Sequence, residues 1–221
     1  MGGYNWNFNA VFSYQDAIVG AALTTLQLAL LTVIIGTVLG LALCIARMSG
    51  NKAVSALAHG LGEVFRNLPV LVVLIWIFYA LPSFGFKLSA FDTAVVGLSL
   101  NLAAFSSEIF RAGINSVPKG QREASLALGL SEIQVMREII LPQAMRTIVP
   151  PLSGRYIETV KMTSLASVIA VNELLHVGGN IISVTYRPLE AYTAISLVYF
   201  AMITPLVYIM GKLEGKPWHA A

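Results

Sequence analysis

Three ionisable side chains follow one another within an apolar stretch of the C-terminal half of the chain. Arg155, Glu158 and Lys161 are spaced three residues apart, so on a helix they lie near one another on one face. Thr163 and Ser164 add two hydroxyl groups directly after them. Ionisable groups inside a membrane span usually face the interior of a bundle or a watery cavity. Two interpretations are open: an internal Glu–Lys pair that neutralises itself, or a polar lining that meets the charged groups of a zwitterion.

Residue patterns typical of enzymes are missing from the sequence. It contains no G-x-x-x-x-G-K-[ST] phosphate loop, so the chain itself is not expected to bind or hydrolyse ATP. No Ser/His/Asp or Cys/His arrangement indicates an intramembrane enzyme. Cys44 is the single cysteine, which excludes an internal disulfide, and His59, His176 and His219 lack metal-ligand spacing. We therefore expect no catalytic residue, metal site or cofactor on this chain.

The composition indicates a membrane protein. Apolar residues make up 57% of the chain, charged residues only 11%, and the mean hydropathy is +0.75. A soluble domain carries about 25% charged residues. Because a transmembrane helix needs about 20 mostly apolar residues, we predict an all-α polytopic membrane helix bundle of about five transmembrane helices, forming a single domain over residues 1–221. The predicted spans are residues 17–46, 65–81, 88–110, 148–175 and 191–210.

The distribution of positive charge predicts the orientation. With the N-terminus outside and the C-terminus cytoplasmic, only Lys87 and Arg187 fall in external loops, which agrees with the positive-inside rule. The excess of basic residues therefore indicates the orientation of the chain in the membrane rather than binding to nucleic acid. The positive residues assigned to cytoplasmic segments are Arg47, Lys52, Arg66, Arg111, Lys119, Arg122, Arg137, Arg146, Lys212 and Lys216.

Smaller features of the spans give three further expectations. Gly36 and Gly40 form a G-x-x-x-G pair that permits close approach of another helix. Glu108 and Arg111 lie one turn apart and are predicted to pair at the membrane interface. Asp92 is predicted to be a solvated charge at the start of a helix.

The longest polar interval, residues 111–147, is predicted to form a cytoplasmic hairpin at about residues 118–142. Pro118 opens a first short helix, and Gly129 is placed to end it in a left-handed conformation. Ser131 and Gln134 have the spacing of a capping box that starts a second helix, with Leu130 and Val135 as a hydrophobic staple. From the residues alone, the hairpin either packs under its own helices or docks to a partner. Pro142 is predicted to interrupt the second helix and redirect the chain toward the membrane.

The hairpin sequence resembles a family signature. Residues 123–129 read E-A-S-L-A-L-G, and after nine residues 139–142 read I-I-L-P. This resembles the E-A-A-x₃-G-x₉-I-x-L-P signature of the permease subunits of ABC importers, with Ser125 in place of the second alanine. Three further stretches resemble the polar amino-acid branch of that family (histidine, glutamate, glutamine, arginine and opines): F-R-N-L-P-V-L at 65–71, S-E-I-F-R-A-G-I at 107–114 and S-V-P-K-G-Q at 116–121.

The resemblance implies a type I ABC importer fold in the bacterial inner membrane, with the hairpin as the coupling helix that contacts an ATPase. The implied partners are a dimer of ATP-binding-cassette subunits that hold ATP and Mg²⁺, a second permease (a copy or a paralogue), a periplasmic or extracellular substrate-binding protein, membrane lipid and a small polar amino-acid-like substrate. The implied ATPase-coupling residues are Glu123, Ala124, Ser125, Gly129 and Leu130.

The substrate path is predicted to involve Glu158, Lys161, Thr163 and Ser164. Similar permeases carry K-D-T-S-L where residues 161–165 read K-M-T-S-L, so Met162 removes a plausible partner for a cationic substrate. The competing hypotheses are an ATP-independent secondary transporter or channel, and an ABC permease for another small polar solute.

Overall fold

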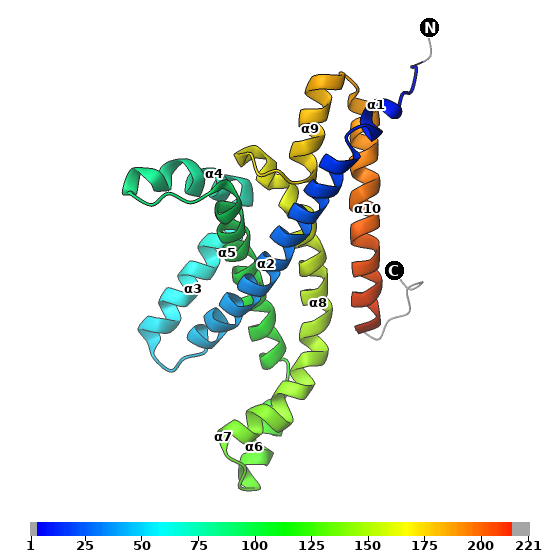
Figure 1. Cartoon of the computed structure of the whole chain (residues 1–221). Helices are drawn as coiled ribbons and strands as arrows, with labels where there is room; N and C mark the ends of the chain where they lie inside the picture. The colour runs from blue at the N-terminus through cyan, green and yellow to red at the C-terminus, as the bar shows by residue number, and fades with distance from the viewer. Residues whose placement is uncertain (1–3, 214–221) are drawn as a thin grey trace. The chain divides into compact units, whose positions relative to one another are not determined.

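The computed structural model describes residues 4–213, and over this part of the chain it is helical with no β-strand (Figure 1). The predicted all-α class is confirmed. Lys216, assigned above to a cytoplasmic segment, and His219, considered above as a metal ligand, lie outside the described residues. In chain order the helices are α1 Asn9–Phe12, α2 Gln15–Arg47, α3 Lys52–Asn67, α4 Val70–Ala80, the 3₁₀ helix η1 Leu81–Phe84, α5 Ala90–Asn115, α6 Lys119–Ala127, α7 Glu132–Gln134, the π-helical turn η2 Val135–Ile140, α8 Leu141–Met162, the 3₁₀ helix η3 Thr163–Ile169, α9 Leu174–Thr185 and α10 Pro188–Leu213.

Among the described residues, three helices are long and apolar enough to cross a membrane: α2, α5 and α10. Two further helix pairs satisfy the same conditions when each bent pair is counted as one span, which gives up to five spans. These pairs are α3 with α4 and η1, and the helical run from Glu132 to Ile169 with α9. The predicted first, third and fifth spans therefore match single helices, whereas the second and fourth correspond to broken ones.

The predicted second span, residues 65–81, is wrong as a continuous helix. Leu68 has extended backbone angles (φ −83°, ψ 134°), and Pro69 is the N-cap of the next helix, α4. The residue before a proline avoids the α-helical conformation because the proline ring clashes with its backbone, so α3 ends here. The helix α3 was not predicted from the sequence. Its mixed apolar and charged residues make a two-faced helix rather than an apolar span.

The predicted fourth span, residues 148–175, is also broken. It starts earlier, within α8, tightens into the 3₁₀ helix η3 and stops at Ala170, which has a left-handed conformation (φ 59°). The chain restarts at α9, whose axis is bent by 48° from the preceding run. Residues 176–185, expected as loop, are helical. Non-helical backbone at membrane depth is tolerated where protein buries it or a watery cavity meets it.

The contacts within the chain define two compact units, each with its own core. In the first unit, Leu28, Leu74 and Ile169 belong to one apolar cluster, and Val11 and Leu174 belong to another. In the second unit, Ala144, Ile148 and Leu152 of α8 form the cluster. The first unit consists of Met1–Val33, Pro69–Leu98 and Ile157–Val207, and the second of Ile34–Leu68, Ser99–Tyr156 and Tyr208–Ala221.

Two glycines of α2 allow α5 to approach closely within the second unit. A Cβ atom on Gly36 would lie 2.8 Å from the Cβ of Leu102, and one on Gly40 would lie 2.8 Å from the Cβ of Ser106. Real Cβ atoms do not approach other atoms so closely. The close helix approach predicted from the G-x-x-x-G pair is confirmed.

Candidate coupling hairpin and polar path

The first helix of the predicted hairpin ends in a Schellman motif. Pro118 precedes α6 directly, and Gly129 has a left-handed φ of +84° just after its end. The amide of Gly129 donates to the carbonyl of Leu126 (3.0 Å), and the amide of Leu130 donates to that of Ser125 (3.2 Å). This pair of bonds satisfies two carbonyls that the end of a helix leaves open. The predicted roles of Pro118 and Gly129 are confirmed.

The second helix of the hairpin starts with the predicted capping box. The side chain of Ser131 accepts a hydrogen bond from the amide of Gln134 (3.4 Å), and the Gln134 side chain accepts one from the amide of Ser131 (2.9 Å). Arg122 of α6 forms an ion pair with Glu132 of α7. The hairpin is therefore held by its caps and by a cross-helix ion pair.

The prediction that Pro142 interrupts the second helix is wrong. The chain continues from α7 through the π-helical turn η2 into α8, and Pro142 is the second residue of α8. Proline lacks an amide hydrogen and clashes with the carbonyl four residues earlier in a regular α-helix. In the π turn immediately before Pro142, each amide bonds to the carbonyl five residues earlier instead of four. This wider turn accommodates the proline without ending the helix.

The base of the hairpin is packed within the second unit. Ile148 of α8 packs against a partly buried group on α5 that includes Ile109 and Ile114. A Cβ atom on Gly113 would collide with the side chain of Ile148, so α5 and α8 approach closely here. The hydroxyl of Ser116 also donates to that of Thr147 (3.3 Å). The base of the hairpin is therefore fixed to the paired segments of α5 and α8.

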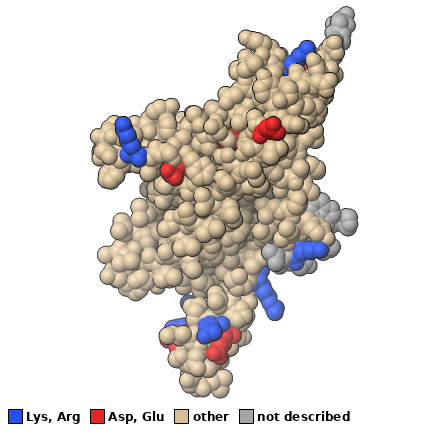
Figure 2. Space-filling model, in the orientation of Figure 1, with Lys and Arg blue, Asp and Glu red and all other residues tan. Residues whose placement is uncertain are grey.

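The tip of the hairpin exposes apolar side chains. Leu128 is 83% exposed and Ile133 is 79% exposed, while Met136 is exposed to a lesser degree. In Figure 2, charged residues gather around this tip at the lower end of the view, beneath a surface that is largely uncharged. We call Leu128, Ile133 and Met136 the apolar tip. Exposed apolar residues rimmed by polar ones are typical of a protein interaction site.

Four of the five residues expected to contact an ATPase are accessible at the hairpin. Glu123, Ala124 and Gly129 are exposed, and Leu130 is half-buried. Ser125 differs, because its side chain is buried and its hydroxyl donates to the carbonyl of Gln121 (2.6 Å). Ser125 therefore lies at the internal packing face of the hairpin. Leu128 and Ile133 are the most exposed apolar residues there, and neither was among the contact residues expected from the sequence.

An ion-pair network lies at the end of the second unit near the junction of α2 and α3. Glu108 of α5 accepts from Arg47 of α2 (2.8 Å) and lies 3.4 Å from Arg66 of α3. It also pairs with Arg111 one turn away, as predicted. Arg66 makes a second pair with Glu63. The Glu108–Arg111 and Glu63–Arg66 pairs have a helical spacing, whereas Arg47 and Arg66 lie far from Glu108 in sequence.

The predicted helix-start charge at Asp92 is confirmed. Asp92 lies in the first turn of α5, where its carboxylate accepts from the hydroxyl of Ser89 (2.6 Å) and its amide donates back to that hydroxyl (3.0 Å). Both side chains are exposed.

Arg155 has a packing role within the second unit. Its guanidinium lies 3.5 Å from the centre of the Phe105 ring and donates to the side-chain oxygen of Asn101 (3.2 Å). Asn101 in turn donates to the backbone carbonyl of Phe65 (3.1 Å). A cation over an aromatic ring is favourable, and more so away from water. Arg155 therefore links α8 to α5 and the end of α3.

The other polar residues of the predicted path lie at the end of α8 and the start of η3. Glu158 and Lys161 are exposed, and Ser164 is half-buried. Thr163 is fully buried, and its hydroxyl donates to the carbonyl of Val160 (2.7 Å). The hydroxyl of Ser164 donates to the carbonyl of Lys161 (2.8 Å). These hydroxyls stabilise the tightening of the helix and keep lone pairs for further hydrogen bonds.

A buried carboxylate that the sequence analysis missed lies at the break after η3. Glu173 is fully buried and caps α9, accepting from the amides of Leu175 (2.9 Å) and His176 (2.7 Å). The hydroxyl of Tyr199 donates to the same carboxylate (2.8 Å), and the hydroxyl of Thr25 accepts from the amide of Leu174. The sequence did contain a signal for this buried group, because Glu173 lies two residues before the expected end of an apolar span. Its side-chain partner, Tyr199, comes from a different helix, α10.

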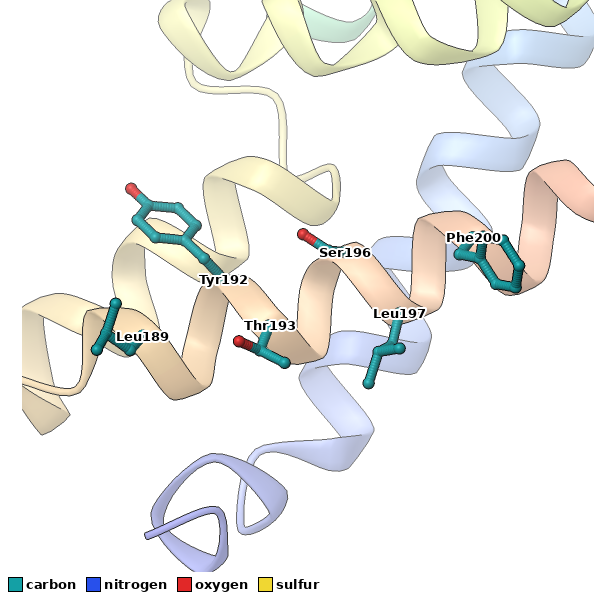
Figure 3. Close-up of a pocket in the computed structure, with 6 residues that line it drawn as sticks. All are labelled: Leu189, Tyr192, Thr193, Ser196, Leu197 and Phe200. Carbon is teal, nitrogen blue, oxygen red and sulfur yellow. The ribbon is translucent and has the colours of Figure 1, made fainter. Parts of the chain in front are cut away.

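The surface also has a shallow pocket that is lined by residues of a single helix. All six residues that line it project from α10, as Figure 3 shows. Their spacing follows one face of a helix, which is exposed along its length. The lining residues are Leu189, Tyr192, Thr193, Ser196, Leu197 and Phe200.

Similarity to known proteins extends over nearly the whole chain. Residues 33–217 match the family model described as binding-protein-dependent transport system inner membrane component. The glutamine transport system permease protein of Escherichia coli strain K12 is 36% identical over 213 residues, which is 96% of this chain and 97% of that protein. The arginine transport system permease protein of Bacillus subtilis strain 168 is 33% identical with the same coverage.

Solved structures show the same fold. A crystal structure of an amino acid ABC transporter with histidines has a chain with a TM-score of 0.89 and 34% identity, covering 96% of this chain and 99% of the other. An inward-facing methionine ABC transporter has a TM-score of 0.77 at 18% identity, covering 91% and 96%. With apolar helices suited to a membrane and a family match over most of its length, this chain belongs to the inner membrane components of binding-protein-dependent transport systems.

Proposed function

We propose that this chain forms the membrane path of an ATP-driven importer for a polar amino acid, and that the apolar tip of its hairpin docks to a separate ATPase subunit. The relatives are named for glutamine and arginine transport, and the structural neighbour for an amino acid. The observation that carries the coupling part is the exposure of Leu128 and Ile133 on a hairpin with a packed base.

The hairpin suits transmission of movement because its parts are rigid. Two caps, the Arg122–Glu132 pair and the packed base leave few internal degrees of freedom. A partner that buries Leu128 and Ile133 gains about 1.5–3 kcal/mol for each side chain. Glu123, Ala124, Gly129 and Leu130 belong to the same proposed contact, with Ser125 supporting it from inside. The partner is an ATPase dimer that binds ATP and Mg²⁺, and each ATPase meets one hairpin of a permease pair, formed with a copy or a paralogue.

The proposed solute path passes Glu158 and Lys161. Placing a charged side chain in the centre of a membrane span costs about 2.5–3.5 kcal/mol on insertion scales. Exposure of both groups near the end of α8 is therefore costly if they face lipid, and acceptable if they face a watery path. Ser164, which is half-buried, supplies hydroxyl lone pairs at the same place, and the fully buried Thr163 supports the turn from inside. This arrangement suits a zwitterion, delivered by an external substrate-binding protein.

Met162 lies between these groups, where similar permeases carry an acidic residue. A thioether offers no counter-charge to a cationic side chain, so we propose a neutral polar amino acid rather than lysine or arginine. Exchange of Met162 for Asp is expected to increase uptake of cationic amino acids relative to neutral ones, measured in competition with radiolabelled substrates. Unchanged relative uptake would contradict the assignment of this position to the path.

The proposed orientation places the N-terminus outside and the hairpin in the cytoplasm, where an ATPase can reach it. The C-terminus, proposed to be cytoplasmic, lies outside the described residues. We also propose that residues 1–221 act as one permease domain, because α2, α5, α8 and α10 each contribute residues to both compact units.

The deciding experiment is to produce the tagged chain in membranes with the products of neighbouring genes and to identify the proteins that co-purify. Recovery of an ATPase subunit and a second permease, with uptake into proteoliposomes that requires ATP, supports the proposal. A chain that purifies alone and conducts solute without ATP contradicts it, and favours a secondary transporter or channel.

A further inference from the structure

The N-terminal segment contains an alternation that the transport function does not use. Residues 4–9 read Y-N-W-N-F-N, with an aromatic residue at each even position and asparagine at each odd one. Residues 4–7 lie outside any helix, and α1 follows at Asn9–Phe12. The rings of Tyr4, Trp6 and Phe8 contact one another in turn, so the aromatic residues share one side of the segment. The asparagines are exposed, and we call them the amide side.

The rings of the aromatic side contact one another in a row. The centres of Tyr4 and Trp6 are 5.2 Å apart in an edge-on arrangement, and those of Trp6 and Phe8 are 5.5 Å apart with nearly parallel planes. Phe8 and Phe12 continue the row at 6.3 Å. Tyr4 is 48% exposed, Trp6 52% and Phe12 58%, so the row faces outward. We call these four residues the aromatic row.

A buried carboxylate fixes the segment to the start of α10. Glu190 is fully buried and accepts from the hydroxyl of Tyr4 (2.5 Å) and from the amide of Asn7 (2.9 Å). Arg187 pairs with Glu190 (3.3 Å) and donates to the backbone carbonyl of Asn5 (2.7 Å). Hydrogen bonds to charged groups are stronger than those between neutral groups. We call this set of contacts the Glu190 clamp.

The aromatic row continues into the apolar surface of two membrane spans. Phe8 and Phe12 line a shared groove with Val19 of α2 and Leu197 of α10. Val19 is 59% exposed and Leu197 62% exposed. The row therefore extends the apolar surface of the span helices beyond the start of α10, and does not form a separate patch.

We propose that the aromatic row lies in the lipid–water interface at this end of the protein, and that the Glu190 clamp holds it there. Tyrosine and tryptophan prefer this layer because an apolar ring carries one polar group; here Trp6 is half-exposed, and the Tyr4 hydroxyl bonds to Glu190. Backbone outside a helix excludes a deeper position in hydrocarbon, where unpaired amides are costly. Residues 4–15 contain no Asp, Glu, Lys or Arg, so they offer no charge to a protein partner. The asparagines of the amide side face water and headgroups.

The test uses Trp6 as a fluorescent reporter. The full chain carrying Trp76→Phe and Trp218→Phe is reconstituted into phosphatidylcholine vesicles that contain lipids brominated at different depths. A matched protein with Trp6→Phe in addition supplies the background signal. We expect bromines close to the headgroup to quench Trp6 more than bromines near the chain end, and we expect protection of Trp6 from acrylamide in the water.

Quenching by acrylamide but not by brominated lipid would overturn the proposal. The proposal would also be overturned if brominated lipid did not quench the Trp6 fluorescence and only addition of a purified substrate-binding protein changed it. The row would then be a protein docking site. Glu190→Gln tests the clamp, and we expect it to reduce lipid quenching and increase acrylamide quenching of Trp6, whereas Tyr4→Phe, which removes one hydrogen bond, gives a smaller change. Unchanged quenching in Glu190→Gln would refute the role of the clamp. The measurement on the chain with an intact clamp does not depend on how that variant folds.

Discussion

Replacement of Ile133 by serine tests the proposed coupling surface with a defined magnitude. The side chain is 79% exposed in the isolated chain, so its removal takes almost nothing from the internal packing. Surface substitutions of this kind usually change the free energy of unfolding by less than about 0.5 kcal/mol. We therefore expect thermal unfolding of the purified permease to be unaffected.

Binding to the ATPase subunit is expected to respond differently. An isoleucine that becomes fully buried on docking contributes about 1.5–3 kcal/mol. Loss of that contribution weakens binding about 10- to 100-fold, because each 1.4 kcal/mol is a factor of ten in the dissociation constant. The same variant should lower the ATPase activity that depends on substrate-loaded binding protein.

The assay is a titration of the ATPase subunit onto immobilised permease, with Ile133→Leu as the matched control. Leucine keeps the apolar area, so the control should bind nearly as tightly as the native chain. Native-like binding by Ile133→Ser, or equal weakening by serine and leucine, would refute hydrophobic docking at the tip.

Three further predictions concern stability, each measured as thermal unfolding in detergent. Gly129→Ala should destabilise the hairpin by about 1 kcal/mol, because alanine avoids the left-handed conformation although space is available around it, and Gly129→Asn should cost less. Gly36→Ala should cost about 1–3 kcal/mol through overpacking against α5, whereas Gly20→Ala, with no atom near the added Cβ, should be neutral or slightly stabilising. Glu108→Gln should cost about 3 kcal/mol because the Arg47 side chain is only 5% exposed and loses its carboxylate partner, whereas Glu63→Gln, at a more exposed pair, should cost at most about 1 kcal/mol. Equal effects within any of these pairs would contradict the corresponding argument.

Local signals in the sequence predicted the hairpin well. Pro118, Gly129, Ser131 and Gln134 act on their own backbone or on residues within four positions, so the caps could be predicted without knowledge of the rest of the fold. The π turn before α8 was not predicted. The incompatibility of Pro142 with a regular helix was apparent, but the residue spacing did not show that a wider turn, rather than a break, would accommodate it.

The broken spans were harder to predict because hydropathy averages over windows and does not register a single change of direction. Pro69 lies within an apolar stretch and was included in a span, although it ends α3. At Ala170 no glycine or proline marks the left-handed residue that ends η3. There the amides of Ala170 and Val171 donate to the carbonyls of Ser167 (3.0 Å) and Ala166 (3.2 Å), and the flanking Ile169 and Val171 are buried.

Composition, charge placement and short-range spacing in the sequence by themselves determined the membrane class, the helical fold, the hairpin and its caps, because each depends on transfer into lipid or on bonds between near neighbours. The tertiary structure decided which side chains of the hairpin are exposed, which arginines gather on Glu108, and how Glu190 holds the N-terminal segment. These outcomes depend on contacts between residues as far apart as Tyr4 and Glu190, and no local pattern fixes the pairing of such distant positions.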